Sequence, residues 1–181
     1  MTSPLVRISK FLSLVLRHDP GRIGLQLDAA GWAEVDELIA AAARGGVEID
    51  RETLARVVAG NDKQRFALTP DGIRIRANQG HSVRVDLGLE PRTPPEVLYH
   101  GTAARFVDSI RESGLHAARR THVHLSADVE TARKVGRRHG SPVVLTVAAG
   151  RMHRDGRVFY QSDNGVWLTD AVPAEYIGFG A

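Results

Sequence analysis

The chain has 181 residues, of which 43% are hydrophobic and 25% are charged. This composition is that of a globular protein with one domain or two lobes of about 90 residues. There is no cysteine, which excludes disulfides, thiolate metal sites, iron–sulfur clusters and cysteine nucleophiles. No apolar run is long enough for a bilayer and the first residues lack a signal-peptide pattern, so we expect a cytoplasmic protein with no membrane partner.

The net charge is only +3, but arginine dominates the basic residues. Three of the 24 basic residues are lysines (Lys10, Lys63 and Lys134), which leaves 21 arginines. A GC-rich genome explains this preference, and so does phosphate binding, because the planar guanidinium group suits phosphate. Neither half of the chain is a basic tail, so a phosphate site would need a local cluster of cations.

The first half of the chain predicts three helices and a hairpin. The expected elements are helices over residues 4–17, 36–44 and 50–60 and strands over residues 65–68 and 73–76. Ile73 and Ile75 are expected to point inward and the two arginines, Arg74 and Arg76, outward. Three helices followed by a two-stranded wing are typical of winged-helix nucleic-acid-binding domains, although a fold does not by itself establish a function.

The second half predicts a mainly β, α+β lobe. Residues 89–96 are rich in proline and read as a linker. The expected elements after it are strands over residues 97–100, 122–125, 142–148, 158–160, 166–168 and 176–179 and helices over residues 104–113 and 128–138. A hairpin is expected at the Asp-Asn-Gly turn before Val166.

Two segments of the first half place cations close together. Arg17 and His18 end the first helix, where they could bind one anion or simply cap the helix. Lys63 and Arg65 lie two residues apart, so an extended chain would put them on one face, whereas a solvated loop would give them no shared role.

A third segment, after the hairpin, is polar and compact. It could present Arg76, Asn78 and His81 to a nucleotide. The alternative is a turn stabilised by its asparagine and glycine.

The second half has two comparable segments. The glycine of His100-Gly101-Thr102 could let a ligand approach the backbone, or the segment could be a strand-to-helix turn with Thr102 as cap. Arg138 belongs to a basic cluster at a helix end, where it could bind phosphate or cap the helix.

A paired-histidine segment raises the question of a metal. His122 and His124 are expected on one face of a strand, but a zinc site needs at least a third ligand, and no metal is expected.

Seven ordered strings resemble one family, the NAD-dependent RNA 2′-phosphotransferases, the KptA-type tRNA enzymes. The strings are LRHDP, NDKQRFAL, IRANQGHS, YHGT, RTHVHLS, VGRRHG and SDNGVWLT, and the resemblance runs to Thr169. It implies an α+β protein with a winged-helix RNA-binding lobe over residues 1–88 and an ADP-ribosyltransferase-like NAD lobe over residues 97–181. The active site would lie in the cleft between the lobes, and we expect a monomer.

The resemblance also implies a two-step reaction. An internal RNA 2′-phosphate attacks the anomeric carbon of NAD and expels nicotinamide, giving an ADP-ribosylated 2′-phospho-RNA. The ribose 2″-hydroxyl then attacks the phosphorus, leaving a 2′-hydroxyl RNA and ADP-ribose 1″,2″-cyclic phosphate.

Roles for particular residues follow from these matches. The catalytic positions are Arg17, His18, Arg65 and Arg138. The expected NAD-binding residues are His100, Gly101, Thr102, His124, Ser126, Asn164, Gly165 and Val166, and the expected RNA-binding residues are Lys63, Arg76, Asn78 and His81.

Two other functions fit parts of the sequence. A protein mono-ADP-ribosyltransferase of the same fold would usually have a glutamate where this chain has Val166. A winged-helix binding module without catalysis would not need the strings of the second half.

Overall fold

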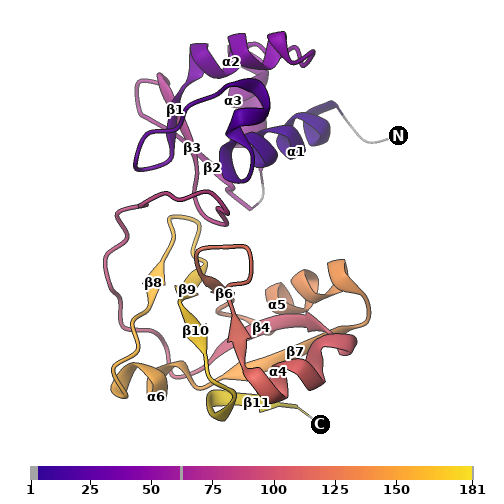
Figure 1. Ribbon diagram of the computed structural model, residues 1–181, viewed down its shortest axis with the longest axis vertical. Coiled ribbons are helices and arrows are strands. Elements are labelled where there is room, and N and C mark those ends of the chain that lie inside the picture. The colour runs from indigo at the N-terminus through magenta and orange to yellow at the C-terminus, as the bar shows by residue number, and fades with distance from the viewer. Residues whose placement is uncertain (1–3, 62, 181) are drawn as a thin grey trace. The chain divides into compact units, whose positions relative to one another are not determined.

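The computed structural model describes residues 4–61 and 63–180 (Figure 1). The chain divides into two compact units, Met1–Gly88 and Leu89–Ala181, which we call unit 1 and unit 2 and describe separately. None of the helices in the described part of the chain is both long and apolar enough to cross a membrane.

Unit 1 contains helices and one small antiparallel sheet. Its elements are α1 (Pro4–Arg17), the 3-10 helix η1 (Pro20–Ile23), β1 (Trp32–Glu34), α2 (Val35–Arg44), α3 (Arg51–Ala59), β2 (Phe66–Leu68) and β3 (Arg74–Ala77). The strands are ordered β1-β3-β2, so the expected hairpin gains β1 as a third strand. Periodicity could not indicate this strand, because three residues are too few for an alternating pattern.

The expected helix boundaries in unit 1 are confirmed within one residue, and so is the cap of α3. The Thr53 amide donates to Asp50 Oδ1 at 2.6 Å, which satisfies one of the unpaired amides of the first turn. Helix α1 buries Leu12, Val15 and Leu16 in the core of unit 1.

The prediction for Ile73 is wrong. This side chain is 48% exposed, whereas Ile75 is fully buried as expected. Strand β3 starts only at Arg74, because the turn that begins at Thr69 extends through Ile73 and is closed by bonds between Thr69 and Arg74.

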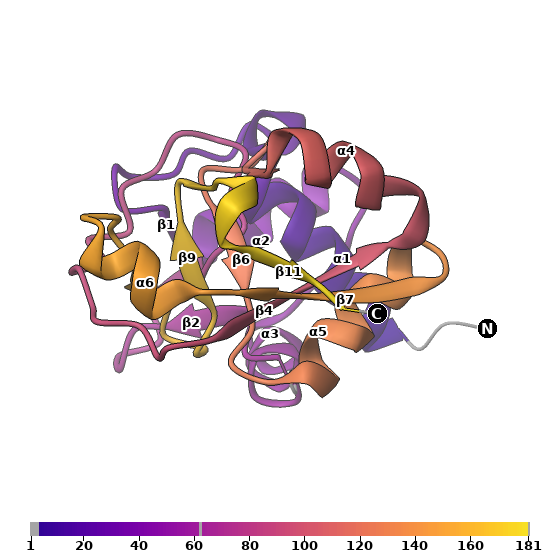
Figure 2. The same ribbon diagram turned by 90° about the horizontal axis from the view of Figure 1, so that it is seen from below.

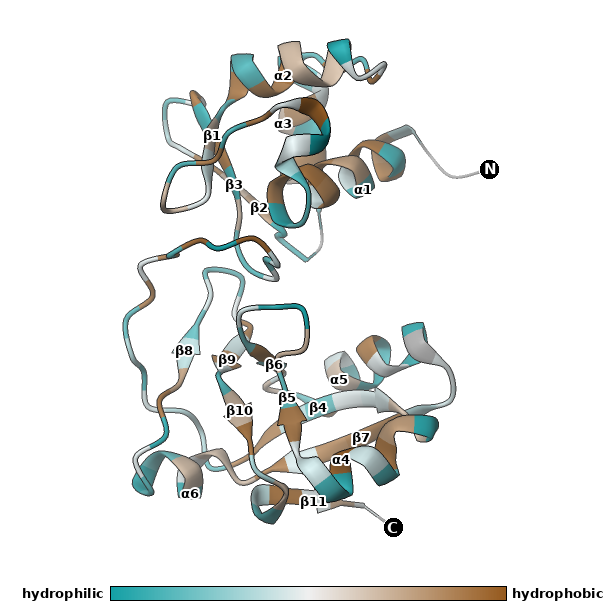
Figure 3. Cartoon of the chain, in the orientation of Figure 1, coloured by the Kyte–Doolittle hydropathy of each residue, from teal (hydrophilic) through white to brown (hydrophobic). Residues whose placement is uncertain are grey.

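Unit 2 is built on two three-stranded antiparallel sheets. Its strands are β4 (Leu98–Ala103), β5 (Leu115–His116), β6 (Val123–Leu125), β7 (Pro142–Val147), β8 (Tyr160–Gln161), β9 (Trp167–Thr169), β10 (Ala171–Val172) and β11 (Ile177–Phe179). The sheets have the orders β11-β7-β4 and β6-β9-β8, and β5 pairs with β10. Strand β7, largely brown in Figure 3, is the hydrophobic centre of the first sheet.

Helices pack on both faces of the β11-β7-β4 sheet. The helices of unit 2 are η2 (Ala104–Phe106), α4 (Val107–Ser113), α5 (Val129–Gly136), η3 (Arg137–His139), α6 (Ala149–Arg154) and η4 (Ala174–Tyr176). Figure 2 shows α4 and α5 on opposite faces of this sheet. The expected helix over residues 128–138 is α-helical only to Gly136 and continues as η3, and α6 was not expected.

Backbone hydrogen bonds between Tyr99 and Ser126 join the two sheets of unit 2. The backbones of Tyr99 and Ser126 donate to each other at 2.9 and 2.8 Å, which links β4 to the end of β6. The polar residues of both strands therefore meet at this junction.

The proline-rich segment 89–96 packs along unit 2. The Arg92 amide donates to the Phe159 carbonyl at 2.8 Å, and the Glu96 carboxylate forms an ion pair with Arg154 at 2.7 Å.

Gly101 is a packing position on β4. A Cβ atom added there would lie 1.7 Å from the Ala132 carbonyl oxygen of α5. The sequence suggested that this glycine lets a ligand reach the backbone, but the space that it leaves is filled by a helix.

We expect Gly101→Ala to destabilise unit 2 by about 3 kcal/mol, because the obstacle is backbone and cannot rotate away. Gly180→Ala is the matched control, since nothing lies within 4 Å of its added methyl group. Urea unfolding followed by circular dichroism measures both. A loss below about 1 kcal/mol for Gly101→Ala would show that α5 shifts easily, contrary to this packing argument.

Candidate functional site

The end of α1 brings Arg17 and His18 to two neighbouring loops. Arg17 Nη2 donates to the Arg65 carbonyl at 3.3 Å, and His18 Nδ1 lies 2.9 Å from Ser82 Oγ. The Ser82 and Val83 amides donate to the Arg17 carbonyl at 2.9 and 3.3 Å. The side chains of Arg17 and His18 therefore contact segments outside α1.

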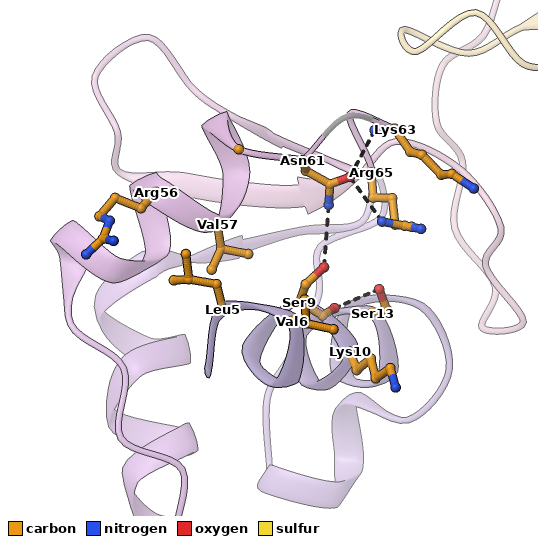
Figure 4. Close-up of a pocket in the computed structure, with 11 residues that line it drawn as sticks. Leu5, Val6, Ser9, Lys10, Ser13, Arg56, Val57, Asn61, Lys63 and Arg65 are labelled. Atoms are coloured by element: carbon orange, nitrogen blue, oxygen red, sulfur yellow. Dashed lines mark hydrogen bonds between the residues drawn. The ribbon is translucent and has the colours of Figure 1, made fainter. Parts of the chain in front are cut away.

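The loop that carries Lys63 and Arg65 is organised by Asn61. Asn61 Oδ1 accepts from the Lys63 amide at 3.2 Å and from Arg65 Nη1 at 3.1 Å, and its Nδ2 donates to Ser9 Oγ at 3.4 Å (Figure 4). Asn61 is 8% exposed. It was not among the predicted site residues, although an asparagine directly after a helix is a typical turn former.

Asn78 stabilises the same loop from the other side. Its Nδ2 donates to the Gln64 carbonyl at 2.6 Å, and its backbone amide donates to the Arg65 carbonyl at 2.9 Å. Gln64 has a φ of 42°, a conformation that is unfavourable for a residue with a side chain and is retained only where surrounding contacts enforce it.

Two of the residues predicted to contact RNA lie in the interior of unit 1. Asn78 is 6% exposed and His81 is fully buried, so little of either side chain is accessible to a substrate. Arg76 is half-buried, with its guanidinium carbon 4.8 Å from the centre of the Trp32 ring. Unit 1 thus brings Arg17, His18, Lys63 and Arg65 into one network.

His81 is an uncharged histidine near three cationic side chains. Burial, together with the positive charges of Arg17, His18 and Arg76, lowers the pKa of His81 to about 4. Neither of its ring nitrogens has a hydrogen-bond partner within the described residues.

We expect His81 to titrate near pH 4 in the folded protein, as followed by NMR of its ring protons. In the unfolded chain the pKa of His81 is near 6.5, so as the pH falls the unfolded state binds this proton before the folded state does. The contribution of the neutral histidine to stability is therefore fully present above pH 6.5. That stability is lost as the pH falls from about 6.5 towards 4. A His81 pKa near 6.5 in the native protein would contradict the burial argument.

In unit 2, three of the predicted NAD residues, His100, His124 and Ser126, lie at the junction of the sheets. His100 Nδ1 lies 3.1 Å from the His124 carbonyl, and because a carbonyl only accepts, this nitrogen carries a proton. Thr102, two residues along β4, is 5% exposed. Ser126 is held by its backbone pairing with Tyr99.

Arg120, which was not predicted as a site residue, contacts one of the predicted NAD residues. Its Nη1 lies 2.8 Å from His124 Nδ1, and because arginine only donates, that nitrogen accepts and the ring proton is on Nε2. Partial burial and the positive charge of Arg138 lower the pKa of Arg120. Two guanidinium groups that repel each other favour an anion close to both. The RTHVHLS string contains Arg120, but only the arginine at the helix end was considered.

The turn between β8 and β9 is held by Ser162. This buried hydroxyl donates to Asn164 Oδ1 at 2.7 Å and accepts from the Val166 amide at 3.2 Å. Gly165 has a φ of 79°, which favours glycine. Because Trp167 pairs with Leu125, Val166 follows in register beside Ser126, close to the other predicted NAD residues.

The paired histidines do not share one environment. The His122 ring packs edge-on against Tyr160 at 5.6 Å, and its Nε2 lies 3.8 Å from Asp170 Oδ1, whereas His124 contacts Arg120. Within residues 4–61 and 63–180 there is no group of three or more side chains arranged to hold a metal ion.

Comparisons with known proteins match nearly the whole chain. The model of the RNA 2′-phosphotransferase, Tpt1 / KptA family matches residues 3–171. A protein of Burkholderia lata described as "Probable RNA 2′-phosphotransferase" is 60% identical over 172 residues, which are 94% of this chain and 89% of the relative. Relatives with the same description from Hahella chejuensis and Pseudomonas aeruginosa are 58% and 59% identical, and the matches cover 98% and 93% of this chain and 95% and 93% of theirs.

These matches show that the chain is a transferase. It belongs to the RNA 2′-phosphotransferase, Tpt1 / KptA family. The resemblance found in the sequence strings is thereby confirmed.

Proposed function

We propose that this protein transfers an internal 2′-phosphate of RNA to NAD, releasing nicotinamide and ADP-ribose 1″,2″-cyclic phosphate and leaving a 2′-hydroxyl RNA. The observation that carries the proposal is the network of unit 1, where Arg17, His18 and Arg65 are tied together through the Arg65 carbonyl and Ser82. Such a network offers convergent donors to a dianionic phosphate. We assign unit 1 to RNA, as a winged-helix lobe, and unit 2 to NAD, as an ADP-ribosyltransferase-like lobe.

The donor set of unit 2 fits the co-substrate. Arg120 and Arg138 would hold the diphosphate of NAD, with His100, His124 and the 162–166 turn near its ribose and nicotinamide. NAD supplies an anomeric carbon with a good leaving group. Arg120 thus joins Arg138, a catalytic position implied by the family resemblance in a cluster that could bind phosphate.

The reacting groups explain which side chains are needed. The attacking 2′-phosphate is already an anion, so the first step needs positioning rather than a general base. In the second step charge grows on the phosphoryl oxygens, which Arg17 and Arg65 stabilise. His18 is exposed, and histidine is the side chain that most often transfers protons in enzymes, so we assign proton transfer in this step to it.

Turnover with and without NAD tests the proposal. Purified protein is incubated with an RNA that carries one internal 2′-phosphate, and products are resolved by gel and chromatography. We expect a 2′-hydroxyl RNA and nicotinamide only when NAD is present. NAD-independent loss of the phosphate, or ADP-ribose attached to protein instead of RNA, would contradict it.

Catalysis is expected to proceed without a divalent ion. The two histidines that could begin a zinc site contact Tyr160 and Arg120 instead, and the chain has no cysteine. Full activity in excess EDTA is the expected result. Activity that EDTA abolishes and zinc restores would show this assignment to be wrong.

A further inference from the structure

A groove with a volume of about 510 Å³ lies between α1 and α3 of unit 1 (Figure 4). Its centre is apolar, where Leu5 and Val6 of α1 face Val57 of α3. Val6 is 44% exposed, so this surface includes a large hydrophobic side chain that unit 1 leaves accessible to solvent. The hydroxyls of Ser9 and Ser13 also line the groove, so it presents polar groups beside apolar ones.

Basic side chains stand at both ends of the apolar centre. Figure 4 shows Arg56 at one end and Lys10, Lys63 and Arg65 at the other. Lys10 and Arg56 are exposed, and none of the described residues that line the groove is acidic. Asp62 lies outside the described residues. A ligand that fits this pattern has an apolar or aromatic part between two anionic groups.

We propose that the groove binds the nucleotide next to the 2′-phosphorylated one in a single-stranded RNA. Its base or ribose lies on Leu5, Val6 and Val57, and its flanking phosphodiesters lie near Lys10 and Arg56. The inference rests on the proposed function, because Lys63 and Arg65 line this groove and also belong to the network assigned to the 2′-phosphate.

Continuity with that network favours RNA over a protein helix as the occupant. Asn61 holds Lys63 and Arg65 on one side and contacts Ser9 of the groove on the other. An RNA chain whose 2′-phosphate binds near Arg65 would therefore continue directly into the groove. Single-stranded nucleic acids are bound in this way, by cations that follow the backbone and by apolar contacts to the bases.

Binding of two RNAs in the absence of NAD tests the proposal. One is a dinucleotide with an internal 2′-phosphate, and the other is a hexanucleotide that carries the same phosphorylated dinucleotide in its middle. We expect the wild-type protein to bind the longer RNA more tightly. In the double variant Lys10→Ala/Arg56→Ala this gain in affinity should be about tenfold smaller. The slope of its hexanucleotide affinity against salt concentration should become shallower by about 1.4, since each of two contacts to single-stranded RNA contributes about 0.7.

The matched control is Arg7→Ala/Arg44→Ala. It removes the same charge from exposed residues of α1 and α2 that do not line the groove. We expect it to keep most of the gain in affinity. A conservative second variant, Lys10→Arg, should retain the charge and the gain, which separates loss of charge from disturbance of α1.

The outcomes distinguish this inference from the proposed function. If the wild type removes the 2′-phosphate with NAD, but the groove variant and the control keep the same gain in affinity, the groove inference is overturned and the function stands. The same result is expected if a protein segment occupies the groove. If the wild type does not act on either RNA, the proposed function fails, and the binding comparison still decides whether the groove takes RNA.

Discussion

Arg65→Ala is expected to slow the second chemical step 100- to 1,000-fold, so that ADP-ribosylated 2′-phospho-RNA accumulates. Loss of one preorganised donor to a developing charge typically has this effect on rate. The first step demands chiefly that the phosphate be positioned, so it should suffer less. Lys63→Ala should act in the same direction but more weakly, because an ammonium group cannot form the two-pronged contact of a guanidinium.

A time course on end-labelled 2′-phosphorylated RNA with excess NAD measures this effect. Arg74→Ala is the matched control, since this exposed arginine of β3 pairs with Asp28 at 3.5 Å and lies outside the network. Complete conversion by Arg65→Ala without an intermediate band would show that Arg65 does not serve the second step. Absence of any reaction would show that Arg65 is already needed in the first chemical step.

Arg120→Ala is expected to lower kcat/KM for NAD about 100-fold, at least as much as Arg138→Ala. Arg120 contacts His124 at 2.8 Å, so its removal takes away both a donor to the diphosphate and the contact that orients the imidazole. Arg120→Lys should recover only part of the loss, since lysine cannot reproduce the planar fork.

Steady-state kinetics at varied NAD and saturating RNA provide the measurement. Arg133→Ala is the control, because this exposed arginine of α5 pairs with Glu130 at 2.9 Å. An Arg120→Ala enzyme with a normal KM for NAD and normal kcat would remove Arg120 from the site. Arg138 alone would then remain the candidate for binding the diphosphate of NAD.

Local signals in the sequence predicted most of the regular structure. The helices of unit 1 follow from apolar spacing and from the Asp50 cap, which the structure confirms. The misses have physical causes. Strands β1, β5 and β10 have only two or three residues each, so they exist only through pairing with distant segments. Ile73 lies outside β3 because the turn before that strand is longer than its sequence suggests.

The candidate site, like the fold, was predictable from the sequence only in part. The proximity of cations in the sequence made Arg17, His18 and Arg65 candidates, and the family resemblance proposed their roles. Their supports were not visible: Asn61 and Asn78 act through contacts with Arg65 and Gln64, which depend on the folded loop. Gly101 could be selected from the sequence, but the reason that a glycine is needed there could not. It is the close approach of α5 at Ala132, which is 31 residues away in sequence.

The fate of the phosphorus atom tests the central claim most directly. An RNA labelled with ³²P in its single 2′-phosphate is incubated with the protein and NAD, and the labelled product is identified by chromatography and mass. We expect the label to leave the RNA joined to ADP-ribose as the 1″,2″-cyclic phosphate, with one nicotinamide released for each 2′-hydroxyl formed. Label released as inorganic phosphate, or nicotinamide released without loss of label from the RNA, would contradict it.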